Sequence, residues 1–260
     1  MSKRKNFARF GMAAKGAVYC LIGVLTALAA FGQGGEKSGS KGALQYLAEQ
    51  SYGQILLVIM GIGLLGYLFW RMYQVFANPN EFEDNLKGYG KRIGYFISGL
   101  IYGGLAFYSL KLAFGSGSSS GSGGMMGGIM SGSNGDTIAI IIGVGIAIKA
   151  IYDLYRAYSN KFREEVEEAG MSRKEQKLLI NAGKFGHTAR GAVLGLMAYL
   201  TLKSGLSSGS SVKTQTDAFS YIQAEFGSIV LGIVAIGLAG YGVYMLIKAK
   251  YPSISVASSN

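Results

Sequence analysis

The sequence predicts an all-α integral membrane protein whose six transmembrane helices form three parallel two-helix repeats with pseudo-threefold symmetry. Three observations support this prediction. The apolar residues gather in six runs, a basic and glycine-rich pattern opens every second run, and most basic residues fall on one side of the resulting topology. A recurrence of this kind indicates one structural unit that is used several times.

The six apolar runs are each long enough to cross a bilayer. Charged residues make up 15% of the chain, below the roughly 25% usual for soluble domains. A helix needs about 20 apolar residues to cross about 30 Å of hydrocarbon, and it satisfies its own backbone amides there. The runs lack the polar stripes that a soluble helical bundle would need. The predicted spans are residues 12–31, 52–73, 93–114, 136–158, 187–206 and 226–247.

The first span of each repeat opens on one pattern: a basic residue, an apolar residue and glycine, with a second glycine five residues later. The copies begin at Arg9, at Arg92 and at Lys184. We expect the residues of this pattern to be structural, because small residues let helices pack closely in lipid. They are Arg9, Gly11, Gly16, Arg92, Gly94, Gly99, Lys184, Gly186 and Gly191.

The second span of each repeat also recurs, with a glycine followed seven residues later by an aromatic residue. These residues are Gly63 and Trp70, Gly145 and Tyr152, and Gly237 and Tyr244. A unit of two spans ends on the side where it began, so successive copies keep one orientation about an axis along the membrane normal. We divide the chain into repeat 1 (1–80), repeat 2 (81–160), a cytoplasmic amphipathic linker (161–181) and repeat 3 (182–260).

The positive charges predict the orientation. The net charge is +11, and all but five of the 25 Lys and Arg residues lie at span ends or in loops on one side. An excess of Lys and Arg marks the cytoplasmic side, so we expect a bacterial inner-membrane protein with both termini in the cytoplasm. Such charges suit anionic lipids. Nucleic acid is not an expected partner, because no aromatic and basic surface lies outside the membrane. The exceptions are Lys37, Lys41, Lys111, Lys203 and Lys213.

With this triplicate pattern, the chain resembles the bacterial six-span membrane proteins catalogued as domain of unknown function 1206. The resemblance extends over nearly the whole chain and rests on the nine motif residues above, together with Tyr152 and Tyr155. The second copy departs from the pattern, because Ser98 stands where the other copies have Lys15 and Arg190. The resemblance implies three two-helix repeats in a membrane and implies no activity.

The links between spans differ in character. The first non-cytoplasmic link, 32–51, predicts a short interfacial helix, and the third, 207–225, repeats its pattern. The middle link, 115–135, is rich in Gly and Ser, which is typical of flexible coil. In the cytoplasmic linker, Ser172 and Glu175 form a capping box that opens a helix. We expect the linker helices to lie on the headgroups; a docking site for a partner is the alternative.

Lys15, Ser98 and Arg190 form the first candidate site. Each lies about one turn inside the first span of its repeat. A threefold arrangement would bring them together as a basic pocket for an anionic lipid headgroup or another anion, aided by the partial positive charge of helix N-termini. In the alternative, the two long basic side chains extend to the headgroup region.

Arg71, Lys149 and Asp153 form the second candidate set. Charges inside spans are costly, are usually paired and point to function. Lys149 and Asp153 are four residues apart on one helix, and Arg71 occupies in repeat 1 the position of Asp153 in repeat 2. An Arg71–Asp153 or a Lys149–Asp153 pair could gate a cytoplasmic mouth. Simple pairing near the membrane interface is the alternative.

No pattern predicts catalysis, a cofactor or a metal site. His187 is the single histidine and could sense pH, but it has no carboxylate at ligand spacing. Met125, Met126 and Met130 could bind Cu(I) through thioether sulfur, but His and Cys are absent from that segment. The Gly-x-Gly patterns lie in coil or on spans and carry no dinucleotide-binding meaning.

Two classes of function remain. A non-catalytic scaffold or accessory subunit that binds lipid or another membrane protein is favoured by short loops and by glycine faces suited to close packing or a homo-oligomer. A small transporter or channel for an ion or small anion along the pseudo-threefold axis is favoured by the charges within the spans. A water-filled polar centre would support transport, and a dry or lipid-filled centre would support the scaffold.

Overall fold

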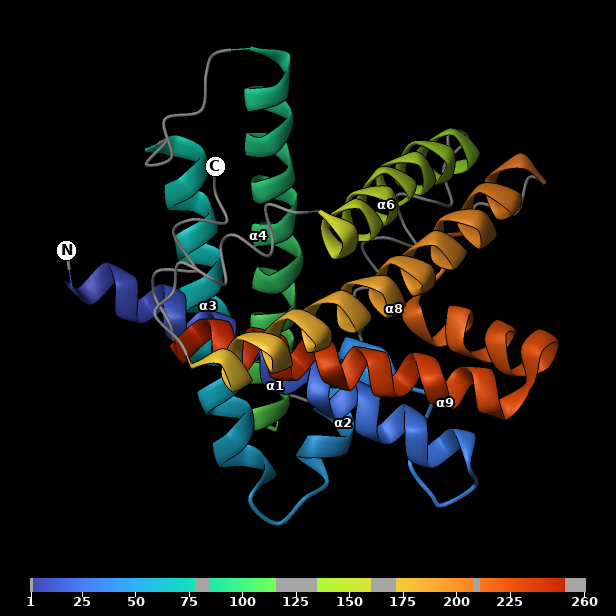
Figure 1. Cartoon of the computed structure of the whole chain (residues 1–260), viewed down its shortest axis with the longest axis horizontal. Helices are drawn as coiled ribbons and strands as arrows, with labels where there is room; N and C mark the ends of the chain where they lie inside the picture. Colours follow the sequence, from blue (N-terminus) through green and yellow to red (C-terminus); the bar gives the residue numbers. More distant parts are fainter. Residues whose placement is uncertain (1, 78–84, 116–134, 160–171, 208–210, 251–260) are drawn as a thin grey trace.

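The described part of the chain is all helical. The computed structural model describes residues 2–77, 85–115, 135–159, 172–207 and 211–250, in which there are seven helices and no strand (Figure 1). The helices are α1 (Ser2–Ala30), α2 (Ser40–Ala48), α3 (Gly53–Phe76), α4 (Leu86–Ala113), α6 (Gly135–Tyr158), α8 (Arg173–Leu206) and α9 (Gln215–Lys250).

Five of these helices are long and apolar enough to cross a membrane, judged by length and composition. Within the described residues, the candidate spans are Arg9–Ala30, Gly53–Phe76, Gly88–Ala113, Gly135–Tyr158 and Gln215–Lys250. The sixth predicted run, 187–206, is helical but lies outside this set, because His187, Arg190 and Lys203 lower the hydropathy of α8. His187 and Arg190 are buried and face the protein interior, whereas Lys203 is exposed.

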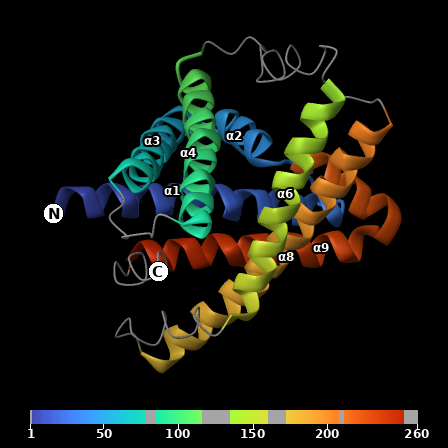
Figure 2. The same ribbon diagram turned by 90° about the horizontal axis from the view of Figure 1, so that it is seen from above.

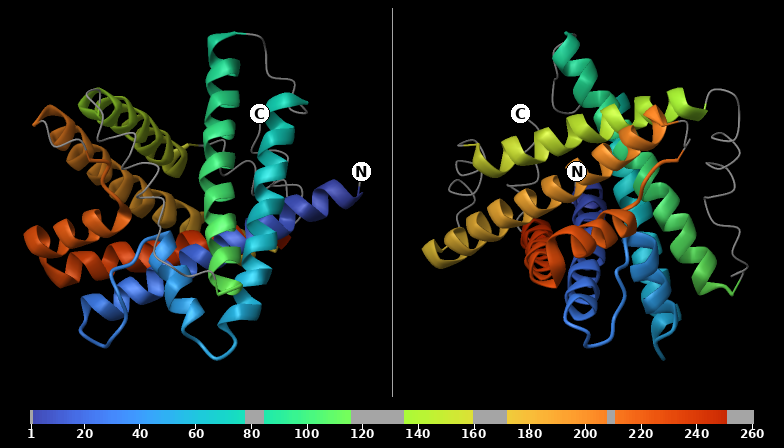
Figure 3. Two further views of the ribbon diagram at one scale, coloured as in Figure 1. Left: turned by 180° about the vertical axis from the view of Figure 1, so that it is seen from behind. Right: turned by 90° about the vertical axis from the view of Figure 1, so that its right-hand side faces the viewer.

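The long helices pack most extensively in three pairs, and each pair joins two repeats. α3 packs on α4, α6 packs on α8, and α9 packs on α1. α1 also packs on α3, and α8 on α9, within repeats 1 and 3, whereas α4 and α6 of repeat 2 are not a packed pair. Figure 1 shows the three pairs running in different directions, with α3 and α4 upright and α1 and α9 across the view. Figure 2 and Figure 3 show the same divergence from other sides.

Equivalent glycines hold the three pairs together. A β-carbon added at the second motif glycine of any repeat would collide with one equivalent side chain of the partner helix. The contacts are Gly16 with Leu246, Gly99 with Met72, and Gly191 with Leu154. Glycine at these positions lets the two backbones approach closely, which is the main source of helix affinity in lipid. The same motif glycine therefore serves the same interface three times.

The first motif glycine packs the two helices of a repeat together, but only in repeats 1 and 3. A β-carbon added at Gly11 would lie 2.6 Å from the backbone nitrogen of Tyr67, and one at Gly186 would lie 2.6 Å from that of Tyr241. At the equivalent Gly94 of repeat 2, no atom lies within 4 Å. Repeat 2 is therefore open where the other two repeats are closed.

Two of the motif basic residues, Arg9 and Lys184, lie at the ends of second helices. Arg9 Nε donates to the carbonyl oxygen of Ala249 at 2.8 Å, and Arg9 Nη2 donates to that of Lys250 at 3.2 Å. The ammonium of Lys184 lies 4.8 Å from the ring centre of Tyr158, the last residue of α6. A cation is favourable at a helix C-terminus, where the carbonyl groups lack partners. The start of α1 and the end of α9 consequently lie side by side.

The described links agree with the sequence. The short helix predicted in the first link is α2, which buries Ala43, Leu44 and Leu47, and its counterpart in the third link forms the start of α9. α9 bends at Gly227, where φ is 80°. The capping box of Ser172 and Glu175 is present at the start of α8. The rest of the middle link, with Met125, Met126 and Met130, and the first half of the linker lie outside the described residues.

Candidate functional site: a central polar cluster

The polar side chains of the spans gather at one place, which we call the central polar cluster. It is built from α1, α3, α4, α6, α8 and α9, and it mixes cations with tyrosines. Its members are Lys15, Tyr19, Tyr67, Arg71, Tyr102, Lys149, Asp153, His187, Arg190 and Tyr241. Most of these side chains are buried.

Arg190 lies at the middle of the cluster. Its Nε donates to the hydroxyl of Tyr19, and its Nη1 donates to the hydroxyl of Tyr241, both at 3.0 Å. The guanidinium carbon also lies 5.3 Å and 4.9 Å from the ring centres of Tyr19 and Tyr241. Nη1 is 3.3 Å from Oδ2 of Asp153. Arg190 thus joins α1, α6 and α9 to its own helix, α8.

Lys15 is held by aromatic rings. Its ammonium lies 4.7 Å from the ring centre of Tyr102, 5.2 Å from that of Tyr67 and 5.8 Å from that of Tyr241. A desolvated cation–π contact contributes about 2 kcal/mol, whereas a lysine at the centre of a membrane costs about 3 kcal/mol. Three rings are therefore enough to offset the burial of this charge.

Asp153 is the carboxylate of the cluster, and three cationic or ionisable groups surround it. Lys149 Nζ lies 2.5 Å from Oδ1, one turn away on α6. On the other side, Arg190 contacts Oδ2, and His187 Nδ1 lies 3.7 Å from Oδ1. The Asp153 side chain is 1% exposed, whereas that of Lys149 is 44% exposed. Lys149 therefore stands at the edge of the cluster.

Arg71 has aromatic and amide partners. Its Nε and Nη2 donate to the hydroxyl of Tyr67 at 2.9 Å and 2.7 Å, and its Nη1 donates to Oε1 of Gln74 at 2.7 Å. Its guanidinium carbon lies 4.4 Å from the ring centre of Tyr95. Of the two pairings considered for Asp153, the structure forms the one with Lys149, while Arg71 binds Tyr67.

The two candidate sets of the sequence analysis merge into one cluster. Lys15 and Arg190 meet at the shared ring of Tyr241, and Ser98 interacts with Tyr67, which also contacts Lys15. Both basic side chains are buried inside the protein. The motif glycines bring these positions together, because Gly11 and Gly186 lie against Tyr67 and Tyr241.

The tyrosines and His187 are the residues that the sequence analysis missed as site residues. Tyr67, Lys149 and Tyr241 each follow the repeated glycine of a second helix by four residues, so the alignment of the copies contained the signal. The ring of His187 stacks edge-on against Tyr241 and Tyr244, with centres 5.1 Å and 5.4 Å apart. The contact of His187 with Asp153 joins α8 to α6, so it connects two residues that are far apart in the sequence.

The cluster has an excess of positive charge. Lys15, Arg71, Lys149 and Arg190 are four cations, and Asp153 is one carboxylate. Within the described residues, no three His, Cys, Asp or Glu side chains lie together as a set that could hold a metal ion. The arrangement is therefore suited chemically to an anion with several oxygen atoms, such as a phosphate.

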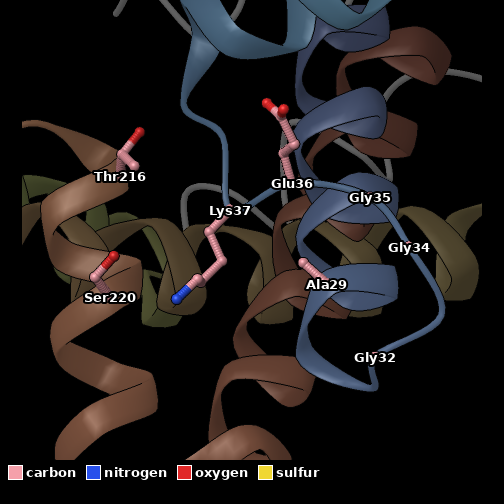
Figure 4. A pocket seen from close by; sticks show the side chains of 8 residues that line it. All are labelled: Ala29, Gly32, Gly34, Gly35, Glu36, Lys37, Thr216 and Ser220. Carbon is pink, nitrogen blue, oxygen red and sulfur yellow. The ribbon is translucent and has the colours of Figure 1, made fainter.

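A second feature is an open depression at the opposite end of α1 (Figure 4). It lies between the α1–α2 link and the start of α9, with Lys37 directed toward Ser220 in Figure 4. Its lining residues are Ala29, Gly32, Gly34, Gly35, Glu36, Lys37, Thr216 and Ser220. Ala29 is fourteen residues from Lys15 along α1, which corresponds to about 21 Å, so this depression is separate from the cluster.

The fold and the cluster define a class: an all-helical membrane protein with a buried, positively charged polar centre. The family model described as Domain of Unknown Function (DUF1206) matches residues 10–78, 93–160 and 185–252, and the chain belongs to this family. These matches confirm the predicted triplication. "Uncharacterized protein YxxB" of Bacillus subtilis (strain 168) is 30% identical over 253 residues, which cover 95% of this chain and 90% of that protein. No solved structure matches the chain.

Proposed function

We propose that the protein is a non-catalytic membrane protein that binds one anionic headgroup, or an anion of the same chemistry, at the central polar cluster. The observation that carries this proposal is the charge of the cluster, where four cations meet one carboxylate. Lys and Arg inside a membrane cost about 3 kcal/mol each and point to function. The aromatic rings and hydroxyl groups that hold Lys15 and Arg71 stabilise these charges without neutralising them. A bound phosphate would supply the missing negative charge with several acceptor oxygens.

The topology that we propose has six spans in the bacterial inner membrane, with three parallel repeats about a pseudo-threefold axis. The equivalent contacts of Gly16, Gly99 and Gly191 support the threefold relationship. The low hydropathy of α8 fits a sixth span, because Arg190 and His187 point into the cluster and away from lipid.

Both termini are placed in the cytoplasm by this proposal. The start of α1 and the end of α9 lie together through Arg9, and the Lys and Arg residues concentrate at that end. The cluster then lies within the cytoplasmic half of the membrane, because Lys15 is only six residues from Arg9. Anionic lipids of the cytoplasmic leaflet are the nearest source of phosphate.

Native mass spectrometry of the full chain, released from mild detergent, tests the anion site. We expect the wild type to retain anionic phospholipid, and the double variant Lys15→Ala with Arg190→Ala to retain about 30-fold less, since each of the two basic residues contributes about 1 kcal/mol. Lys37→Ala with Lys213→Ala removes two charges elsewhere and should change nothing. Equal retention by the cluster variant would refute the site. If that variant does not fold, Lys15→Met gives the same test, because methionine fills the space between the rings of Tyr67, Tyr102 and Tyr241 without a charge.

A second candidate is a small anion transporter or channel. It is favoured by the half-exposed Lys149, which leads from the surface to the buried Asp153. A rim cation beside a buried charge network is the arrangement expected for an ion path. Anion flux into liposomes that contain the wild-type protein, lost in Asp153→Asn, would support this function. Equal flux from liposomes without protein would exclude it for the anions tested.

A further inference from the structure

Repeat 2 leaves uncovered the helix faces that repeats 1 and 3 bury. The glycine contacts that close repeats 1 and 3 have no counterpart here: a β-carbon at Gly94 of α4 or at Gly145 of α6 would meet no atom within 4 Å. In the closed repeats, the position of Gly145 is taken by Gly63 and by Gly237. Gly63 contacts Ala14 and Gly237 contacts Ala189, each on the first helix of its own repeat. One repeat in three is therefore open along its internal interface.

Large apolar side chains line the uncovered face of α4. Ile97 is 51% exposed and Ile101 is 63% exposed. These two positions are exposed in repeat 2 alone, whereas positions on the outer surface are exposed in all three repeats. The buried equivalents of these two isoleucines are Ala14, Val18, Ala189 and Val193.

The sequence explains why repeat 2 does not close. Ile97 stands where the other repeats have alanine, and Ile148 of α6 stands where they have Gly66 and Gly240. Close packing of helices in lipid depends on small residues at the contact. Two isoleucines in place of an alanine and a glycine hold α4 and α6 apart, so the opening is built into the sequence.

The uncovered faces end at the cations of the cluster. Lys149 follows Ile148 directly and occupies the position that Tyr67 and Tyr241 hold in the closed repeats. Its side chain is half exposed and binds the buried Asp153. The opening therefore has an apolar part and, at its cytoplasmic end, a positively charged part.

We propose that one anionic phospholipid of the cytoplasmic leaflet occupies the uncovered faces of α4 and α6. Its phosphate lies at Lys149, at the edge of the central polar cluster, and one acyl chain runs along Ile97 and Ile101. This inference rests on the proposed anion-binding function and adds the ligand class and its position. The charge decides between occupants. A partner helix would cover the isoleucines but would leave the excess positive charge of the cluster unbalanced, whereas an anionic phospholipid would cover the isoleucines and balance the charge.

A photoreactive side chain can report which lipid lies at this face. We would place p-benzoylphenylalanine at position 101, or at position 107 as the matched control, in protein reconstituted in vesicles of phosphatidylglycerol and phosphatidylcholine. Phe107 lies on the same helix and is 71% exposed, and its equivalents Val24 and Tyr199 are also exposed, so position 107 samples bulk lipid.

The expected result is that adducts at position 101 are enriched in phosphatidylglycerol about fivefold over those at position 107. Adducts at both positions that match the vesicle composition would overturn the proposal. So would adducts at position 101 to a second copy of the chain, because the face would then be a protein interface.

A closing variant gives a second test. Ile97→Ala with Ile148→Gly imports the residues of the closed repeats, so α4 and α6 should pack and the enrichment at position 101 should fall to the bulk ratio. Persistent enrichment in a folded variant would contradict the proposal. The two proposals fail separately: if Lys15→Ala with Arg190→Ala lowers lipid retention while position 101 reports bulk lipid, the anion site stands and only its position between α4 and α6 is wrong.

Discussion

Arg190 on α8 and Asp153 on α6 form a buried ion pair, with Nη1 and Oδ2 3.3 Å apart. The two residues belong to different repeats, and each binds further partners: two tyrosine hydroxyls for Arg190, and Lys149 for Asp153. This pair fixes the most extensive contact of repeat 2 with repeat 3 and connects the rim of the cluster with its centre.

Neutralising Asp153 should destabilise the protein strongly. Asp153→Asn leaves Arg190 and Lys149 without their carboxylate, and removal of one partner of a buried pair costs about 3 kcal/mol. Thermal unfolding in detergent measures the effect as a lower Tm. Glu225→Gln, at an exposed carboxylate of α9, is the control and should leave Tm unchanged. Equal Tm values for wild type and Asp153→Asn would show that the pair contributes nothing to stability.

The first motif glycine should respond to alanine in a repeat-specific way. Gly11→Ala and Gly186→Ala place a β-carbon 2.6 Å from a tyrosine backbone nitrogen, so both should lower Tm by separating the helices of their repeats. Gly94→Ala meets no atom within 4 Å and should be neutral or stabilising, by up to about 1 kcal/mol from helix propensity. A loss of stability at Gly94 equal to that at Gly11 would mean that repeat 2 is closed like the others.

The ring of Tyr102 should stabilise the fold through its contact with Lys15. Tyr102→Leu removes the nearest ring and should destabilise by about 2 kcal/mol, whereas Tyr102→Phe keeps the ring and should change little. A double-mutant cycle with Lys15→Met, read by chemical unfolding, isolates the interaction. A coupling energy near zero would show that Lys15 is not stabilised by this ring.

Arg9 should hold the end of α9. Arg9→Ala removes two hydrogen bonds to the carbonyl oxygens of Ala249 and Lys250, each of which contributes about 1 kcal/mol. Hydrogen exchange at the last turn of α9 should become faster, with little change elsewhere. Arg9→Lys keeps the charge near the helix end and should restore part of the protection. Unchanged exchange in Arg9→Ala would contradict this role.

The sequence was sufficient to predict the repeats because their chemistry is local. The glycine spacing of Gly11 and Gly16 reappears in every copy, and every motif glycine except Gly94 has a helix contact that can be reasoned from packing. The capping box of Ser172 and Glu175 was predictable for the same reason, since both residues lie within one turn. Helix α8 shows the limit of hydropathy, because Arg190 counts as polar wherever it points.

The connections of the cluster could not be predicted from single helices. Tyr67 and Tyr241 resemble ordinary interfacial aromatics in sequence, and only the folded chain shows that they bracket Lys15. The contact of His187 with Asp153 depends on the packing of α8 on α6. The opening of repeat 2 was encoded by Ile97 in place of alanine, but its consequence appears only by comparison with the closed repeats.

The most direct measurement is a crystal structure of the full chain grown from a lipidic mesophase doped with phosphatidylglycerol. We expect density for one phosphate within about 4 Å, the ion-pair distance, of two or more of the cations Lys15, Arg71, Lys149 and Arg190. A cluster whose charges are balanced by carboxylates of the chain itself, with no bound anion, would contradict it.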